Sequence, residues 1–277
     1  MIIEPLAGAL GAEVRGIDLR VADDAAWQRV REVFLEYAVL VFRDQQLEPA
    51  DLMRVGERWG EPCHYPFVTG IDGFPFIFEV VKEEQETVNF GGNWHSDTTY
   101  LEQPPLATLL YALETPARGG DTLFSSSYAA YDALSDGMRA MVGKLVGVNS
   151  SSLKVTGGRR KMHSTIGSMK VQGMEEADRY EAEHPAVRTH PDTGRKALYL
   201  SRSHTIHFKD MSEEESRPLI DMLQAHQIRP EFTCRVRWAP GTLTVWDNRC
   251  TQHCAVNDYH GQRRRMQRLT VGAQTPQ

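Results

Sequence analysis

Residues 243–253 read LTVWDNRCTQH, and this stretch decides the fold class. It begins with an apolar, β-branched and aromatic run that is typical of a buried strand, and Asp247 to Arg249 then predict a turn before a histidine, His253. Outward from it, short runs of the same strand-like composition recur at 39–42, 76–80, 108–111, 196–200 and 232–238. Many short strands separated by turns predict a mainly β fold, with a closed or double-layered antiparallel core of the jelly-roll type.

Helical patterns are few, and we expect these helices to flank the β core. Residues 23–37 begin with aspartate cap candidates and carry one apolar face. Residues 49–59 begin with a proline in the first turn, and residues 212–227 begin with a serine cap and three glutamates. Because no repeat or linker divides the chain, we predict a single domain over residues 1–277.

Composition and charge exclude several classes of protein. The 31 Lys and Arg against 37 Asp and Glu give a net charge of −6, which argues against nucleic acid as a partner. Mean hydropathy is −0.43, and no apolar run approaches the ~20 residues of a membrane-spanning helix. The N-terminus lacks the pattern of a signal peptide, and the four cysteines are too few for a disulfide scaffold. We therefore expect a cytoplasmic protein with no membrane partner.

Two of the cysteines raise a separate metal hypothesis. Cys250 and Cys254 are four residues apart and could share an ion. No further Cys or His pair completes a zinc spacing, however. We regard this as the minor hypothesis for metal binding.

One segment differs in character from the rest of the chain. Residues 149–172 carry five Lys and Arg, no acidic residue and a Gly-Gly pair. Long irregular stretches inside compact domains are usually functional lids or disordered. Two interpretations are open: a solvated surface loop, or a mobile lid over about 149–185 that attracts an anion.

Two histidines and an aspartate are the first candidate functional residues. On a strand, residues two apart point to the same face, so His95 and Asp97 could reach one ion. This H-x-D tripeptide alone is a weak signal, because a lone histidine is more often packed or capping. With His253 it becomes a two-His, one-carboxylate facial triad, which leaves half of an octahedral ion open and suits non-haem Fe(II) and oxygen chemistry.

The segment 262–268 places four arginines close to that triad in the sequence. If the segment is a strand, Arg264 and Arg268 lie on one face and can line the same cavity. The planar fork of an arginine matches a carboxylate. For Arg263 and Arg265 we expect surface ion pairs instead.

Taken together, the chain resembles the taurine dioxygenase / phenoxyacetate herbicide dioxygenase family of Fe(II)- and 2-oxoglutarate-dependent oxygenases. The resemblance covers nearly the whole chain, in order and in spacing, and its motifs lie at 5–19, 41–45, 93–97, 119–122 and 246–253. It implies a double-stranded β-helix core with flanking helices. It also implies Fe(II) as cofactor, 2-oxoglutarate and O2 as cosubstrates, and a homo-oligomer, either a dimer or a tetramer.

The same resemblance implies roles for individual residues. His95, Asp97 and His253 resemble the iron ligands of the family. Arg264, eleven residues after His253, resembles the arginine that binds the distal carboxylate of 2-oxoglutarate. Thr122 resembles the hydroxyl that joins it there.

For the substrate side of the site, the resemblance is looser. Arg268 resembles the residue that pairs with the sulfonate in the taurine enzymes, and His64 resembles a substrate-contacting histidine. Asn93 could shape the pocket, but Gly91 and Gly92 precede it where the taurine enzymes present an asparagine, which disfavours taurine itself. The expected substrate is a small organic anion, such as an alkyl sulfonate, a sulfate ester or an aryloxyalkanoate, hydroxylated and often cleaved next to a heteroatom.

Three other interpretations remain open at this stage. The triad could belong to a zinc hydrolase, although no glutamate follows His95 in the way such an enzyme needs. It could belong to a non-catalytic β-barrel sensor that holds a metal and an anion. The substrate could also be amino-acid-like or a natural product.

Overall fold

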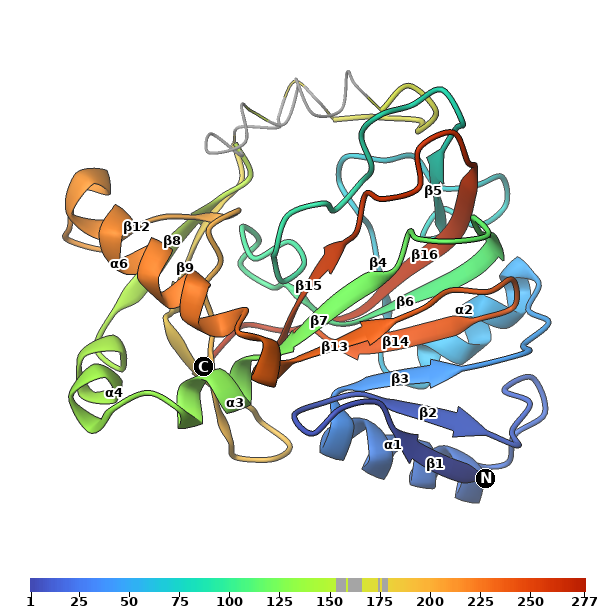
Figure 1. The fold of residues 1–277 in the computed structure, drawn as a ribbon, viewed down its shortest axis with the longest axis horizontal. Helices are drawn as coiled ribbons and strands as arrows, with labels where there is room; N and C mark the ends of the chain where they lie inside the picture. The colour runs from blue at the N-terminus through green and yellow to red at the C-terminus, as the bar shows by residue number, and fades with distance from the viewer. Residues whose placement is uncertain (153–157, 159–165, 174, 176–178) are drawn as a thin grey trace.

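The computed structural model describes residues 1–152, 158, 166–173, 175 and 179–277 of the chain. Most strands lie in one large sheet (Figure 1). All its pairings are antiparallel except that of β2 with β3. In order across the sheet the strands are β1 (Ile2–Pro5), β2 (Ala12–Arg15), β3 (Val39–Phe42), β14 (Leu243–Asp247), β6 (Pro105–Glu114), β16 (Arg264–Ala273) and β4 (Pro62–Cys63), with β5 (Phe78–Lys82) also on β16.

A smaller antiparallel sheet faces the middle of the large one. It consists of β13 (Thr233–Val236), β7 (Thr122–Ser126) and β15 (Thr251–Ala255), in that order. An apolar cluster fills the space between the two sheets, where Phe124 and Val236 of the small sheet join Leu110, Trp246 and Met266 of the large one. The mainly β fold that the sequence predicts is therefore present, with two facing layers of strands.

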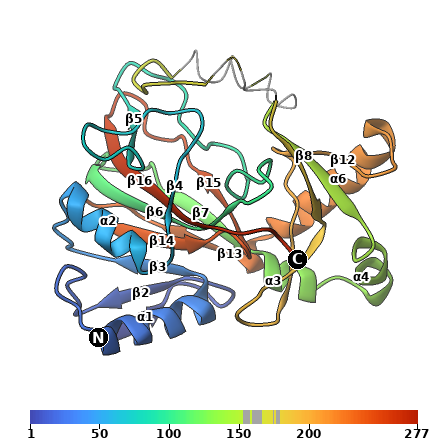
Figure 2. The ribbon, with the colours of Figure 1, turned by 180° about the vertical axis from the view of Figure 1, so that it is seen from behind.

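Helices cover the opposite face of the large sheet. α1 (Asp24–Tyr37) and α2 (Pro49–Glu57) lie there, as the view from behind shows (Figure 2). Their apolar residues, among them Val30, Phe34 and Leu52, pack with Leu109 and Leu269 of the sheet in a second buried cluster. Asp23 caps α1, as its sequence predicts, by accepting a hydrogen bond from the backbone N–H of Ala26.

The remaining elements gather at one side of the molecule, on the left of Figure 1. They are β8 (Val146–Ser150), β9 (Glu181–Pro185), β12 (Thr205–Phe208), β10 (Val187–Thr189), β11 (Lys196–Leu198), the 3-10 turn η3 (Pro230–Phe232) and the helices α3 (Ser127–Asp132), α4 (Asp136–Val142) and α6 (Glu213–Gln227). Ser212 caps α6 in a full capping box with Glu215, which confirms the predicted helix start.

One predicted strand needs correction in its bounds, and the predicted lid stays a prediction. The strand expected at 76–80 begins two residues later and runs to Lys82, because Ile77 is buried without joining the ladder with β16. In the predicted lid at 149–185, residues 149–150 and 181–185 are strand, and 166–173 are attached by backbone hydrogen bonds to Phe67 and Thr69. Much of the remainder, 153–157, 159–165, 174 and 176–178, lies outside the described residues.

Within the described ranges, no helix is both long enough and apolar enough to cross a bilayer.

Candidate metal and anion site

The two predicted histidines are held together by backbone pairing. His95 lies in the connection between β5 and β6, and His253 lies on β15. The N–H of each donates to the carbonyl of the other, at 3.1 and 2.8 Å, in an isolated antiparallel bridge. The strand expected at His95–Asp97 does not form, since the chain turns at Asp97 and Thr98 has a φ of 44°. The bridge, rather than a strand, brings the side chains together.

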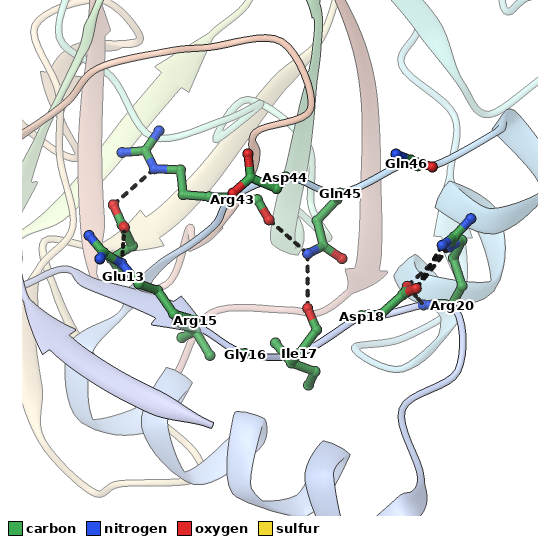
Figure 3. A pocket seen from close by; sticks show the side chains of 11 residues that line it. Glu13, Arg15, Gly16, Ile17, Asp18, Arg20, Arg43, Asp44, Gln45 and Gln46 are labelled. Carbon is green, nitrogen blue, oxygen red and sulfur yellow. Dashed lines mark hydrogen bonds and ion pairs between the residues drawn. The ribbon is translucent and has the colours of Figure 1, made fainter.

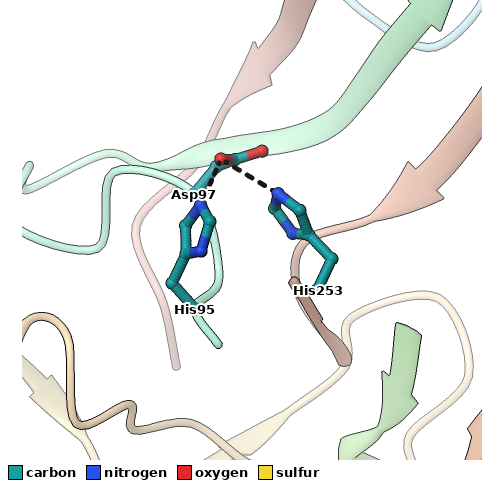
Figure 4. Close-up of side chains that lie close together, drawn as sticks. All are labelled: His95, Asp97 and His253. Atoms are coloured by element: carbon teal, nitrogen blue, oxygen red, sulfur yellow. Dashed lines mark ion pairs between the residues drawn. The ribbon is translucent and has the colours of Figure 1, made fainter. Parts of the chain in front are cut away.

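The three side chains of the predicted triad converge in space. Oδ1 of Asp97 lies 3.6 Å from Nε2 of His95 and 3.7 Å from Nε2 of His253 (Figure 4). Asp97 and His253 are buried, and one ligand atom from each of the three residues lies within 4.8 Å of the others. This set of two nitrogens and one oxygen is that of a facial triad.

Local contacts prepare both imidazoles as ligands. Nδ1 of His95 lies 2.6 Å from the carbonyl oxygen of Asn93. Because a carbonyl can only accept, Nδ1 carries a hydrogen, and Nε2 is the nitrogen that can bind an ion. Burial, followed by the neighbouring His95, holds the pKa of His253 well below its usual value, so His253 is neutral. A metal requires this protonation state of an imidazole.

Asp97 is an ionised carboxylate despite its burial. Burial by itself would raise its pKa, but the Arg268 guanidinium, followed by His253 and His95, holds the pKa well below the usual value. Nη2 of Arg268 lies 2.5 Å from Oδ1, as an ion pair without in-line hydrogen-bond geometry. Oδ2 accepts a hydrogen bond from the hydroxyl of Thr108 at 2.7 Å.

Four aromatic rings surround the guanidinium of Arg268. Its guanidinium carbon lies 5.7–5.9 Å from the ring centroids of Tyr65, Phe78, Phe90 and Trp246. Low polarity around a cation strengthens its attraction for an anion. This part of the site can therefore hold the charged end of a small apolar anion.

Arg264 is a second buried cation in the same cavity. With Thr122, Arg268 and His253 it lines the pocket, and it is 5 % exposed. No described residue accepts a hydrogen bond from its Nε or Nη2. Burial lowers the pKa of its guanidinium, and Tyr259 and Asp121 only partly oppose this. A buried cation lacking these bonds is costly, and a bound carboxylate would supply them.

The prediction that Arg264 and Arg268 share a face of one strand is confirmed, because both lie on β16 and line this cavity. Their neighbours also behave as predicted. Arg263 pairs with Glu83 and Glu114, and Arg265 pairs with Glu79, all on the outer side.

Two predicted substrate contacts lie elsewhere. His64 is exposed, and its ring packs on Phe76 with centroids 4.2 Å apart, so the structure does not bring it to the triad. The alternation of the chain turns the next residue, Tyr65, inward over Arg268 instead. The Asn93 side chain is also exposed, and Asn93 contributes its carbonyl rather than its amide.

Sequence reasoning missed Thr108 and Asn248. Thr108 is fully buried on β6, in a run that is otherwise mostly apolar, and it touches the Asp97 carboxylate. Asn248 follows β14 and donates to Thr108 at 2.8 Å. A threonine inside a buried apolar run was the available signal, since a buried hydroxyl needs a partner.

A second group of possible ligands lies at His190, Asp247 and Cys250. Asp247 accepts from the Arg249 side chain at 2.8 and 2.7 Å and from Nε2 of His190 at 3.0 Å. Burial, then Asp247, raises the pKa of the Cys250 thiol well above its usual value. Cys254, the other half of the minor metal hypothesis, contacts the carbonyl of Gly92 instead. This group is a closed structural network.

A surface pocket between β2 and the segment after β3 is polar, and most of its charged side chains form ion pairs (Figure 3). Arg43 donates to Glu13 at 2.9 Å, and Arg20 donates to Asp18 at 2.7 Å. Gln45 joins the two segments through the carbonyl of Ile17. These contacts hold the two segments together.

Comparison with known proteins agrees with this geometry. The family model described as "Taurine catabolism dioxygenase TauD, TfdA family" matches residues 2–270. The alkylsulfatase of Acinetobacter baylyi is 34% identical over 98% of this chain and 85% of its own length. The alpha-ketoglutarate-dependent sulfate ester dioxygenase of Pseudomonas putida is 34% identical over 99% of this chain and 90% of its own length.

A solved structure agrees as well. The crystal structure of a taurine dioxygenase from Burkholderia xenovorans superposes with a TM-score of 0.81. It is 30% identical to this chain, and the match covers 99% of this chain and 92% of that one.

Proposed function

The chain belongs to the taurine catabolism dioxygenase TauD, TfdA family of 2-oxoglutarate-dependent enzymes, and from that premise we propose that it oxidises a small, largely apolar organic anion. The family uses Fe(II), 2-oxoglutarate and O2. The observation that carries the proposal is one cavity holding His253 of the triad together with two buried arginines.

His95, Asp97 and His253 would hold the iron. A neutral His253 and an ionised Asp97 fit Fe(II), and three ligands leave positions for 2-oxoglutarate and O2. Iron bound there supplies oxygen activation coupled to the decarboxylation of 2-oxoglutarate to succinate. The protein's part is to bind, to orient and to exclude water.

Arg264 and Thr122 would bind the distal carboxylate of 2-oxoglutarate. Two facts support this: the unpartnered donors of Arg264 point to a missing anion, and Thr122 lines the same cavity. The Thr122 hydroxyl already accepts from the indole of Trp238 at 3.0 Å, so its own hydrogen remains for a carboxylate.

Arg268 would bind the anionic group of the substrate, with apolar walls around the carbon to be oxidised. Val80, Phe90, Leu110 and Ala255 line the cavity beside it. Such a lining favours alkyl sulfates, alkyl sulfonates and aryloxyalkanoates over taurine, whose ammonium needs a polar partner. The names of the two sulfate-ester relatives support the same class.

Several broader features belong to the same proposal. The two facing sheets support a double-stranded β-helix core in a single domain over 1–277. The four free thiols fit a reducing cytoplasm. A dimer or tetramer rests on family resemblance alone.

The test is succinate release from 2-oxoglutarate under air with added ferrous ion, across a panel of alkyl sulfates, alkyl sulfonates, aryloxyalkanoates and taurine. We expect substrate-dependent succinate with at least one apolar anion. Metal binding without succinate for any substrate would instead favour a sensor, and zinc-dependent hydrolysis would favour a hydrolase.

Arg268→Ala sharpens this test. It should lower turnover of the best anion while leaving substrate-independent decay of 2-oxoglutarate largely intact, because Arg264 still holds the cosubstrate. If the preferred substrate is neutral, Arg268 does not bind an anionic group of the substrate.

A further inference from the structure

A chain of directed hydrogen bonds ends on the carboxylate of Asp97. Nε1 of Trp246 donates to Oδ1 of Asn248 at 3.0 Å. Nδ2 of Asn248 donates to Oγ1 of Thr108 at 2.8 Å, and Thr108 donates to Oδ2 of Asp97 at 2.7 Å. All four residues are at most 3 % exposed, so water does not compete for these bonds.

The direction of this series of hydrogen bonds is determined at Trp246. An indole N–H can only donate, so it fixes which end of the Asn248 amide is oxygen and turns the NH2 group toward Thr108. Thr108 Oγ1 accepts that bond, and its own hydrogen points to Asp97. An ionised carboxylate is an acceptor only, which completes a one-way sequence of donors.

The consequence concerns the two oxygens of Asp97. Oδ2 accepts the hydrogen bond of Thr108, whereas Oδ1 faces Nε2 of both His95 and His253 and forms the ion pair with Arg268. A carboxylate that offers both oxygens to a metal would take a further coordination position. The site needs that position for 2-oxoglutarate or O2.

We propose that Thr108 and Asn248 are positioning residues that keep Asp97 a one-oxygen ligand of the metal. This inference rests on the proposed function, because it concerns how the triad holds its ion. Neither residue itself lines the cavity around Arg264 and Arg268, and the series of hydrogen bonds reaches the triad through Asp97.

The experiment titrates Mn(II) into the full chain without substrate, by calorimetry and by water-proton relaxation. Thr108→Val removes the hydroxyl at nearly constant volume, and we expect about 10–100-fold weaker Mn(II) binding, the usual effect of losing such a contact. We also expect one metal-bound water fewer, because the freed Oδ2 takes its place. Thr108→Ser should restore both values.

Thr244→Val is the matched control. Thr244 is fully buried on the adjacent strand β14, and its hydroxyl meets no hydrogen-bond partner among the residues that the structure describes. Its replacement should change neither the Mn(II) affinity nor the water count. An equal effect of both threonine variants would show general damage and overturn the proposal.

Asn248→Asp tests the direction of the hydrogen bonds from Trp246 to Asp97. The new carboxylate would accept the hydrogen of Thr108 and withdraw it from Asp97, so Mn(II) binding should weaken. In a Thr108→Val background the same change should add much less, as two residues in one chain are not additive. If Thr108→Val fails to fold, Asn248→Asp against Thr108→Ser gives the same comparison.

Two failures are distinguishable. If the wild-type chain binds neither Mn(II) nor Fe(II), the proposed function is wrong. If the wild type binds Mn(II) and the folded Thr108→Val chain binds it equally well with the same water count, only the positioning role is wrong.

Discussion

Among the residues that the structure describes, two clusters of nearly the same composition could hold a metal ion, and in only one of them do the ligand atoms face a common point. One holds His95, Asp97 and His253, and the other holds His190, Asp247 and Cys250. In the first, one oxygen of Asp97 and both Nε2 atoms face a common point. In the second, Arg249 and His190 donate hydrogen bonds to both carboxylate oxygens of Asp247.

The tautomers explain the difference. Nδ1 of His95 donates a hydrogen bond to the carbonyl of Asn93, so Nε2 is the nitrogen that can face an ion. In His190 the opposite holds, because Nδ1 accepts from the N–H groups of Asp192 and Thr193 and Nε2 carries the hydrogen. Residue type therefore suggests a metal site, while the surrounding hydrogen bonds decide whether lone pairs remain for the ion.

The largest expected effect separates the clusters by function. His253→Ala should abolish substrate-dependent succinate release and Mn(II) binding, because it removes one of three ligands. His190→Ala should leave one Mn(II) per chain, provided that the variant is folded by circular dichroism. Two metals per wild-type chain, or succinate release from His253→Ala, would contradict the assignment.

A second prediction concerns stability. Asp247→Asn removes the charge that Arg249 and His190 contact, and breaking such a buried network should cost about 3–5 kcal/mol in the free energy of unfolding. Asp18→Asn, in the exposed pair with Arg20, should cost about 0–1 kcal/mol. Urea unfolding measures both, and equal costs would show that the cluster is not a closed network.

A third prediction concerns Arg264, whose buried guanidinium lines the same cavity as His253. Arg264→Ala should raise the 2-oxoglutarate concentration for half-maximal turnover roughly 10–100-fold, the effect of losing a charged hydrogen-bond pair. Arg265→Ala, on the outer face of the same strand, should leave it unchanged. An unchanged requirement in Arg264→Ala would take that residue out of the cosubstrate site.

The smallest expected effect is a dependence of folding stability on pH, with contributions from both clusters. The His253 pKa lies below its usual value of 6.5, so the unfolded chain takes up a proton first and stability falls as the pH drops below about 6.5. The Asp247 pKa lies below 3.8, so its contribution is present above that pH and is lost as the pH falls further.

Each group contributes at most about 1.4 kcal/mol per pH unit. Urea unfolding from pH 7 to 3 with a chelator present measures the two phases. His253→Ala should reduce the upper phase, to which His184 also contributes through its lowered pKa, and Asp247→Asn should reduce the lower phase, to which Asp97 also contributes. A wild-type chain whose stability is flat between pH 7 and 5 would contradict the buried neutral His253.

Much of the framework was predictable from local patterns. The capping signals of 23–37 and 212–227 and the apolar run at 39–42 predict their elements closely, because these depend on neighbours in sequence. The alternation of side chains along 263–268 likewise predicted that two arginines face inward and two outward. The segment at His95–Asp97 was wrongly expected as a strand, since its pairing partner lies more than 150 residues away.

The sequence by itself therefore determined the fold class, the triad and the inward arginines, because strand periodicity and ligand chemistry are properties of residue type and spacing. Only the tertiary structure decided that Tyr65 rather than His64 faces Arg268, and that Thr108 and Asn248 direct the Asp97 carboxylate. Those contacts join strands that are distant in the chain. A hydrogen bond depends on where two backbones bring its atoms, and no local pattern encodes that.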